Sequence, residues 1–283
     1  MSHSGTLYVV ATPIGNLQDI TLRALEVLKS VDLVAAEDTR HTAGLLSHFG
    51  LHKKMLALHE HNERQAGEKI LQALQSGQSV ALVSDAGTPG ISDPGAVLVD
   101  MAHAAGFRVV PLPGPCAAAA ALSAGGLTQP HFLFYGFLPA TGAQRRKAIE
   151  SLREVAATLV FYEAPHRILD CVADLAQALG PARGLVVARE LTKTFETIHR
   201  TSLGEASEWL QADANRQRGE FVLLVEGHAP QAAAEVDAEA LRVLQLLLNE
   251  LPLKQAVKLA TEITGAKKNA LYESALKMKA EAE

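Results

Sequence analysis

The chain contains 283 residues, of which 48% are apolar, 20% charged and 5% aromatic. This composition excludes a disordered tail, a disulfide-stapled mini-protein and a collagen-like rod, and the length suits two domains with a small appendage. The 26 Lys and Arg residues stand against 31 Asp and Glu, which leaves a net charge of −5. The surface as a whole therefore does not attract nucleic acid, and any such binding must be local.

Cysteine content and hydropathy predict where the protein works. The two cysteines, Cys116 and Cys171, are too few for a disulfide framework. No apolar run approaches the roughly 18 residues of a membrane span, and no apolar leader segment follows Met1. We therefore expect a cytoplasmic protein that does not bind a membrane.

The first part of the chain alternates short apolar runs with amphipathic segments, which is typical of an α/β fold. The runs predicted to be strands are residues 7–11, 33–36, 55–58, 80–83 and 109–112. Most of them lack polar alternation, as strands covered on both faces do. Gly50, Gly77 and Gly106 follow amphipathic segments and are predicted to end helices.

A second α/β series follows, and after it the strand pattern stops. Its predicted strands are residues 132–135, 158–162, 185–188 and 221–225, with a basic helix from Ala143 and another helix from His166. Residues 228–237 have no apolar period and are predicted to be a linker. Three helical segments, 238–249, 253–263 and 266–279, then form a module in which Gly265 makes a tight helix-turn-helix bend. The predicted domains are 1–126, 127–230 and 237–283.

Three loops rich in Gly and Pro stand directly after predicted strands, where ligands collect in parallel α/β sheets. They are residues 11–17, 84–95 and 113–116. Such loops are rigid and let main-chain groups approach a small polar ligand. The small residues from Ala117 to Leu122 would leave a slot for a flat group such as adenine, or would pack tightly on the sheet. The sequence lacks the Gly-rich signatures of NTPases and dinucleotide oxidoreductases.

Six motifs follow one another along the chain, TPIGNL (12–17), AEDTR (36–40), SDAGTPGISDPG (84–95), PGP (113–115), FYEAPHR (161–167) and VARELTK (187–193). Together they resemble the ribosomal RNA branch of the tetrapyrrole methylase superfamily. The resemblance extends from about residue 5 to residue 227 and on into the C-terminal helices. The resemblance implies two α/β domains with S-adenosylmethionine (AdoMet) in the cleft between them, and a homodimer. It also implies methylation of the ribose 2′-hydroxyl of a cytidine in the decoding region of 16S ribosomal RNA.

The resemblance further implies which residues meet the cofactor. The expected contacts are Pro13, Ile14, Gly15, Ser84, Asp85, Ala86, Gly87, Thr88, Pro89, Pro113, Gly114, Pro115, Cys116, Ala117 and Tyr162. One departure is plain, because the segment that begins at Ser84 is not the Gly-Gly-Asp-Pro of other branches. A side-chain contact made there in relatives is made here by Asp85 or by none. The departure favours the ribosomal RNA branch over the branches that modify tetrapyrroles.

Methyl transfer to a ribose hydroxyl requires alignment and removal of a proton, and it needs no metal because the cofactor supplies the activated methyl group. The candidate bases are Glu163, Glu190 and His166, with Arg167, Arg189 and Lys193 as phosphate or alkoxide partners. Glu163 and Glu190 each stand beside an arginine, so structural ion pairs are the alternative. The histidines of His59-Glu60-His61 lack a recognised ligand spacing, and no metal site is expected there.

Local basic clusters predict where RNA binds. Residues 252–280 carry six Lys against two Glu, in a chain that is acidic overall. The expected RNA contacts are Asp38, Arg40, Asn62, Arg145, Arg146, Arg167, Lys193, Lys267 and Lys268. The partner would be 16S ribosomal RNA or the small ribosomal subunit. The alternative interpretation is that these basic residues only form helix faces exposed to solvent.

For the function of the whole protein, two alternatives stay open. One is a methyltransferase that acts on a tetrapyrrole or another small molecule, and the other is a non-enzymatic ribosome-assembly factor.

Overall fold

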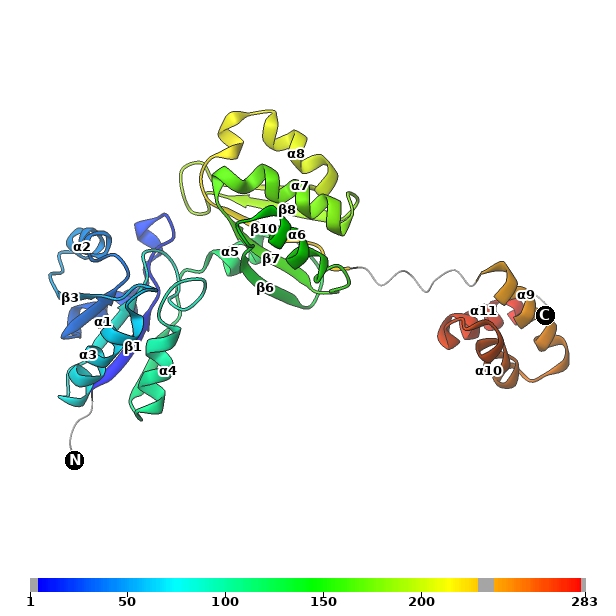
Figure 1. Cartoon of the computed structure of the whole chain (residues 1–283), viewed down its shortest axis with the longest axis horizontal. Coiled ribbons are helices and arrows are strands. Elements are labelled where there is room, and N and C mark those ends of the chain that lie inside the picture. Colours follow the sequence, from blue (N-terminus) through cyan, green and yellow to red (C-terminus); the bar gives the residue numbers. More distant parts are fainter. Residues whose placement is uncertain (1–4, 229–236, 281–283) are drawn as a thin grey trace. The chain divides into compact units, whose positions relative to one another are not determined.

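The computed structural model describes residues 5–228 and 237–280. The chain divides into two compact units, Met1–Gly227 and His228–Glu283. The first unit holds two sheets of five strands each, and the second unit contains helices (Figure 1). The predicted linker lies largely outside the described residues.

The first sheet is wholly parallel, with strand order β3-β2-β4-β1-β5. Its strands are β1 (Thr6–Val10), β2 (Leu33–Ala36), β3 (Lys54–Ala57), β4 (Val80–Val83) and β5 (Arg108–Leu112). Central β1 pairs on both sides, with Leu7 opposite Val80 of β4 and Val109 of β5. Every residue of β2 and β4 is buried, so the apolar runs without polar alternation correspond to strands covered on both faces.

Helices cover both faces of this sheet because alternate strand residues point to opposite sides. The helices are α1 (Leu22–Ser30), α2 (Thr39–His48), α3 (Glu63–Gln75) and α4 (Ala96–Ala104), with a 3₁₀ turn, η1, at Leu17–Asp19. Helices α1 and α2 pack with Val34 and Ala36, whereas α3 and α4 pack with Leu33 and Ala35. The glycines predicted to end helices all have left-handed φ angles, +67° at Gly50, +87° at Gly77 and +76° at Gly106.

The second sheet has strand order β6-β7-β10-β8-β9 and is mixed. Its strands are β6 (Phe132–Phe137), β7 (Thr158–Glu163), β8 (Gly184–Arg189), β9 (Thr197–Ser202) and β10 (Phe221–Val225). Only β6 and β7 run parallel, and the other pairs are antiparallel. Strand β9 was not predicted, because as a polar edge strand it has no apolar run.

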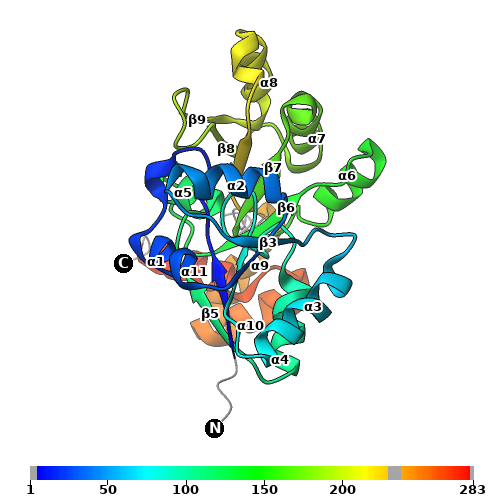
Figure 2. The same cartoon turned by 90° about the vertical axis from the view of Figure 1, so that its left-hand side faces the viewer.

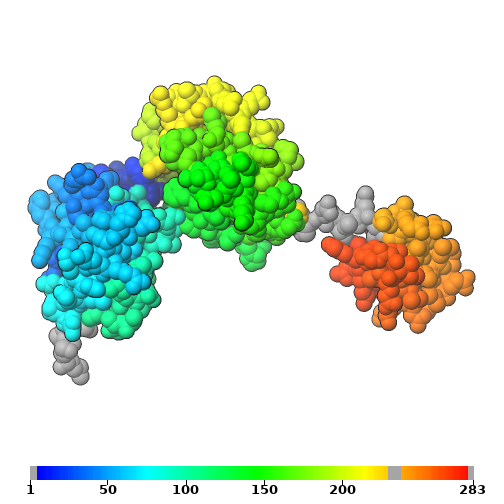
Figure 3. Space-filling view, in the orientation of Figure 1, coloured from blue at the N-terminus to red at the C-terminus, as the bar shows by residue number. Residues whose placement is uncertain are grey.

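One face of the second sheet is covered by helices that follow β6 in the chain. They are α6 (Gly142–Glu150), α7 (Ile168–Leu179) and α8 (Leu203–Gln211), with short 3₁₀ turns η2 (Pro165–Arg167) and η3 (Ala214–Gln217). Helices α7 and α8 lie side by side in both cartoon views (Figures 1 and 2), and they share one core with β7 and β8. In the space-filling view they form the green to yellow surface of this unit (Figure 3).

Helix α5 (Ala117–Gly125) covers the other face of the second sheet, although its sequence position placed it in the first predicted domain. Ala118 and Ala121 are buried against Val160 and Val186. A Cβ at Gly125 would lie 2.6 Å from Leu224 Cδ1. The small side chains of α5 therefore allow close helix-on-sheet packing, while its first residue faces the cavity described below.

The second unit consists of α9 (Ala238–Glu250), α10 (Leu253–Thr264) and α11 (Lys268–Ala280). Leu244, Val257 and Leu271, one from each helix, are buried in its core. Gly265 has φ of +72° and ends α10, as the tight turn requires. The structure thus has the predicted fold class, two α/β sheets followed by a three-helix module.

Candidate active site

The loops after β1 and β4 are joined by main-chain hydrogen bonds. Thr12 N donates to Gly87 O over 2.9 Å, and Gly87 N donates to Thr12 O over 3.0 Å. The buried Thr12 hydroxyl also donates to Ser84 O over 3.0 Å. Thr12 and Ser84 therefore act as scaffold, which holds the neighbouring loop residues in fixed positions.

The loop of residues 84–95 is tied down at both ends. The Thr88 hydroxyl donates to Pro115 O over 3.0 Å, which links this loop to the one after β5. At the far end, Glu63 Oε1 accepts from Gly95 N and Val97 N over 2.8 and 2.9 Å. This carboxylate occupies the N-terminus of α4, where the unpaired N–H groups favour a negative charge. All three predicted loops thus form one rigid rim.

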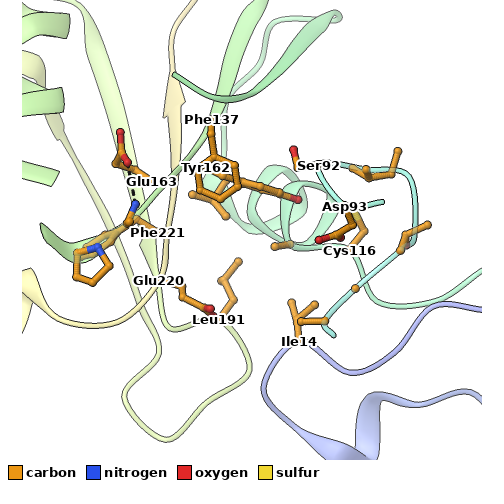
Figure 4. A pocket seen from close by; sticks show the side chains of 18 residues that line it. Ile14, Ser92, Asp93, Cys116, Phe137, Tyr162, Glu163, Leu191, Glu220 and Phe221 are labelled. Atoms are coloured by element: carbon orange, nitrogen blue, oxygen red, sulfur yellow. Dashed lines mark hydrogen bonds between the residues drawn. The ribbon is translucent and has the colours of Figure 1, made fainter. Parts of the chain in front are cut away.

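A cavity of about 330 Å³ lies between this rim and the second sheet (Figure 4). Its volume is within the range of roughly 300 to 1,000 Å³ that small-molecule sites occupy. The predicted site residues that line it are Ile14, Ala86, Gly87, Thr88, Cys116, Ala117, Tyr162 and Glu163. The other predicted cofactor contacts are absent from the lining given by the described residues and flank it in the same loops; they are Pro13, Gly15, Ser84, Asp85, Pro89, Pro113, Gly114 and Pro115.

Sequence reasoning missed much of the lining. The missed residues are Ile91, Ser92, Asp93, Phe137, Ala164, Pro165, Leu191, Glu220, Phe221 and Val222. Ile91, Ser92 and Asp93 belong to a loop that the sequence had already singled out, and the left-handed φ of +65° at Ser92 is a departure that only the structure reveals. Phe137 of β6 and Phe221 and Val222 of β10 lie within strands and not in Gly- and Pro-rich loops. They were missed because only the pairing of strands in the second sheet brings them to the cavity.

Tyr162 stands at the centre of the wall formed by the second sheet. Its hydroxyl accepts a hydrogen bond from Ala118 N over 3.1 Å, and burial raises its pKa well above the usual value. The rings of Phe134 and Phe137 meet it edge-on, at centroid distances of 5.1 and 5.7 Å. A bulge between Phe134 and Gly136 shifts the strand register, which is how both phenylalanines reach the same tyrosine.

Asp93 faces the same cavity from the rim and carries a perturbed pKa. Burial, followed by the nearby Glu37 and Asp85 carboxylates, raises the pKa of Asp93 to about 7. Burial also raises the pKa of Glu37. Asp85 has a structural task, because its Oδ1 accepts from Asp38 N over 3.0 Å. A partly buried carboxylate with a shifted pKa in a cavity is a typical mark of a functional site.

The three candidate bases lie in different surroundings. Glu163 lines the cavity, is only 2% exposed and pairs through Oε1 with Arg167 Nε at 3.2 Å. Its side chain is fully buried and hydrogen-bonds with the Cys171 thiol of α7. His166 is exposed on η2 and is not among the lining residues that the described chain provides.

Glu190 is held in a network beside the cavity. Its Oε1 accepts from Lys193 Nζ over 2.8 Å and from Glu220 N over 3.0 Å. Burial opposes ionisation of Glu190, but these hydrogen bonds and the positive charge of Lys193 outweigh it and lower its pKa. Its backbone has a left-handed φ of +51°. Both Glu163 and Glu190 therefore form the structural ion pairs that the sequence offered as the alternative to a catalytic role.

Several predicted RNA contacts have structural tasks in the first unit. Arg145 is only 5% exposed and its Nε donates to Asp174 Oδ2 over 2.7 Å, so it offers no surface to a nucleic acid. Arg167 Nη2 donates to Leu138 O over 2.7 Å. Asn62 Oδ1 accepts from His59 N over 2.9 Å and so shapes the turn before α3.

Other predicted RNA contacts are accessible. Arg40 is almost fully exposed and pairs with Asp38 at 3.1 Å. Arg146 is half exposed although it also touches Asp174, at 3.2 Å. Lys193 bridges Glu190 and Glu220 at 2.8 Å each and is less than a third exposed. In the second unit, Lys267 and Lys268 are both exposed.

Comparison with known proteins decides the family. Residues 6–207 match the model of Tetrapyrrole (Corrin/Porphyrin) Methylases, and residues 231–279 match that of the RsmI C-terminal HTH domain. The chain is 58% identical to the ribosomal RNA small subunit methyltransferase I of Escherichia coli O157:H7, over 96% of this chain and 95% of that one. It is 57% identical to the protein of the same name from Pseudomonas aeruginosa, over 96% and 97%. The chain belongs to the ribosomal RNA small subunit methyltransferase I family.

Solved structures share the fold of this family at low sequence identity. The methyltransferase CobJ has a TM-score of 0.60 at 21% identity, over 80% of this chain and 95% of that one. A uroporphyrin-III C-methyl transferase from Thermus thermophilus, complexed with S-adenyl homocysteine, has a TM-score of 0.54 at 18% identity, over 79% and 98%. These likenesses concern the fold alone.

The described residues contain neither a cluster of metal-binding side chains nor a membrane-spanning helix. Within residues 5–228 and 237–280, no group of three or more His, Cys, Asp or Glu side chains could hold a metal ion. None of the helices in those ranges is both long and apolar enough to cross a membrane.

Proposed function

We propose that this methyltransferase transfers a methyl group from AdoMet to the ribose 2′-hydroxyl of a cytidine in the decoding region of 16S ribosomal RNA. The observation that carries the proposal is the cavity of about 330 Å³, bounded by the loops that the family motifs singled out. The names of the curated relatives, at more than half identity over almost the whole chain, supply the substrate class.

The residues of the cavity fit this cofactor. Gly87 has a left-handed φ of +85°, and a Cβ there would come within 3.4 Å of Ile14, so the bare backbone leaves room for a ligand. Ile14, Ala117 and Tyr162 offer apolar surface for a flat base. When bound, the cofactor supplies an activated methyl group and a neutral leaving group.

Among the three predicted bases, Glu163 is the one we propose for proton removal, because it is the one of the three whose residue lines the cavity in the described part of the chain. Its carboxylate is fully buried, with Arg167 and Ala164 N on Oε1 and the Cys171 thiol beside it. Proton removal by Glu163 therefore requires the substrate hydroxyl to reach a group that the free protein shields from solvent. Glu190 is already engaged by Lys193, and a role for it or for His166 requires contacts that RNA itself would bring.

The RNA is proposed to meet both units. Arg40 and Arg146 offer exposed guanidinium groups on the first unit, and Lys267 and Lys268 offer exposed ammonium groups on the second. The proposed assembly is a homodimer, and a ribosomal substrate implies action in the cytoplasm. The proposed domain limits are residues 1–126, 127–230 and 237–283, with α5 at the end of the first segment packed on the sheet of the second.

Transfer of tritiated methyl groups to small ribosomal subunits tests the proposal. We expect label on one cytidine of 16S ribosomal RNA, protected from alkaline hydrolysis at the adjoining phosphodiester because the 2′-oxygen is methylated. Label on a base, or no label on RNA, would contradict the proposal. Methylation of a tetrapyrrole in the same assay would favour the small-molecule alternative.

A further inference from the structure

The charges in the cavity wall are unevenly compensated. Three carboxylates, Asp93, Glu163 and Glu220, line the cavity, and the described lining contains no Lys, Arg or His. Glu163 pairs with Arg167, and Glu220 pairs with Lys193 at 2.8 Å. Asp93 has neither a hydrogen bond nor an ion pair within the described chain. It is the uncompensated carboxylate of this wall.

The surroundings of Asp93 make this position more unfavourable for a negative charge. Glu37 and Asp85 stand close enough behind it to repel its charge, and neither has a cationic side chain bonded to it within the described residues. In front of it are the apolar ring and neutral hydroxyl of Tyr162 (Figure 4). A partly buried carboxylate without a partner destabilises the free protein, and a cation placed in the cavity relieves that cost.

We propose that Asp93 is the counter-ion for the positive charge of the methyl donor and that it strengthens binding of the charged donor relative to uncharged adenosine thioethers. This inference rests on the proposed function, because the donor is the ligand assigned to this cavity. It assigns the role to a residue outside the contacts predicted from the sequence. The main chain of the rim then holds the neutral parts of the ligand, whereas Asp93 recognises charge.

Three ligands separate the possible sources of that charge. AdoMet carries a sulfonium and an ammonium group, S-adenosylhomocysteine carries the ammonium alone, and 5′-methylthioadenosine carries neither. The dissociation constants of all three are measured by calorimetry at pH 8 on the full-length protein, Asp93→Asn and Asp100→Asn. Asp93→Asn keeps the side-chain shape and removes the charge. Asp100→Asn removes the same charge from an exposed position on α4 outside the cavity lining.

We expect Asp93→Asn to weaken AdoMet binding roughly 10- to 100-fold, because a partly exposed charge pair loses less than the fully buried pairs whose disruption costs more. Binding of 5′-methylthioadenosine should stay within about threefold. An equal loss for S-adenosylhomocysteine assigns the contact to the ammonium group, and an unchanged value assigns it to the sulfonium. Both results support the inference. Unchanged AdoMet affinity, or an equal loss for all three ligands, would overturn it.

Thermal stability provides a second readout. Removal of an uncompensated carboxylate should raise the melting temperature of the free Asp93→Asn protein at pH 8, although its AdoMet affinity falls. A merely structural role for Asp93 predicts a lower melting temperature instead, and that result would count against the inference. Because no RNA enters these assays, the two proposals fail separately. A wild-type protein that does not bind AdoMet contradicts the proposed function, whereas Asp93→Asn that binds like the wild type contradicts the counter-ion role alone.

Discussion

At the scale of single residues, neighbours decide what each titratable group can do. Glu163 and Glu190 have similar positions in the sequence, each at the end of an apolar run beside an arginine. In the structure both carboxylates are engaged, Glu163 by Arg167 and the main chain of Ala164 at the cavity wall, and Glu190 by Lys193 and the main chain of Glu220. The sequence named both as candidates and could not rank them, because the contacts that separate them come from distant segments.

Glu163→Gln tests the proposed base. The amide keeps the acceptor for Ala164 N but cannot take up a proton, so we expect kcat to fall about 10²- to 10⁴-fold. AdoMet affinity, measured by calorimetry, should change little, which separates chemistry from binding. Unchanged kcat would move the role to Glu190, His166 or solvent.

The pKa of about 7 at Asp93 predicts a pH dependence of donor binding. Asp93 faces Glu37, Asp85, Tyr162 and Cys116, and its proton is lost as the pH rises through about 7. The carboxylate attracts the cationic donor and the neutral acid does not, so AdoMet affinity should rise between pH 6 and pH 8. Calorimetric titrations across this range check the expectation. A profile that is equally steep in Asp93→Asn would assign the titration to another group.

At the scale of elements, rigidity comes from links between loops and from close packing of α5. The loops after β1, β4 and β5 are joined by Thr12 and Thr88, so the rim behaves as one body. The Gly and Pro content of these loops predicted rigidity but not the partners. Prediction from sequence was also incomplete for α5. Its alanines indicated close packing, but they did not reveal that the helix packs on the second sheet.

Gly125→Ala tests the packing of α5. The added Cβ would lie 2.6 Å from a methyl group of Leu224, so we expect a loss of about 1–3 kcal/mol in the free energy of unfolding. Gly44→Ala is the matched control, since a Cβ within α2 at that position has open space around it. The control should be neutral or stabilising by up to about 1 kcal/mol, because alanine favours a helix. Denaturant melts measure both variants, and similar values for the two would contradict the packing account.

At the scale of the whole molecule, catalysis and RNA capture are expected to separate along the chain. The cavity belongs entirely to the first unit, whereas Lys267 and Lys268 stand on the second. Each unit has its own buried core.

Truncation after Gly227 tests this separation. We expect the shortened protein to bind AdoMet within about threefold of the full chain, because every described lining residue is retained. Binding to small ribosomal subunits, measured by co-sedimentation, should weaken at least tenfold as the exposed lysines are lost. Full subunit binding by the truncated protein would place the main RNA contacts on the first unit.

By itself, the sequence determined the alternation of strands and helices, the glycine-ended helices, the three rigid loops and the C-terminal helical module. These features arise from local periodicity and from backbone preferences that operate over a few residues. Only the tertiary structure decided that β9 completes the second sheet, that α5 packs on that sheet, and that Arg145 is buried on Asp174. It also decided that Asp93 lines the same cavity as Tyr162 and lies close enough to Glu37 to be repelled by its charge. The burial of a side chain and the charges around it depend on which distant segments of the chain pack together. Local sequence patterns do not predict that packing.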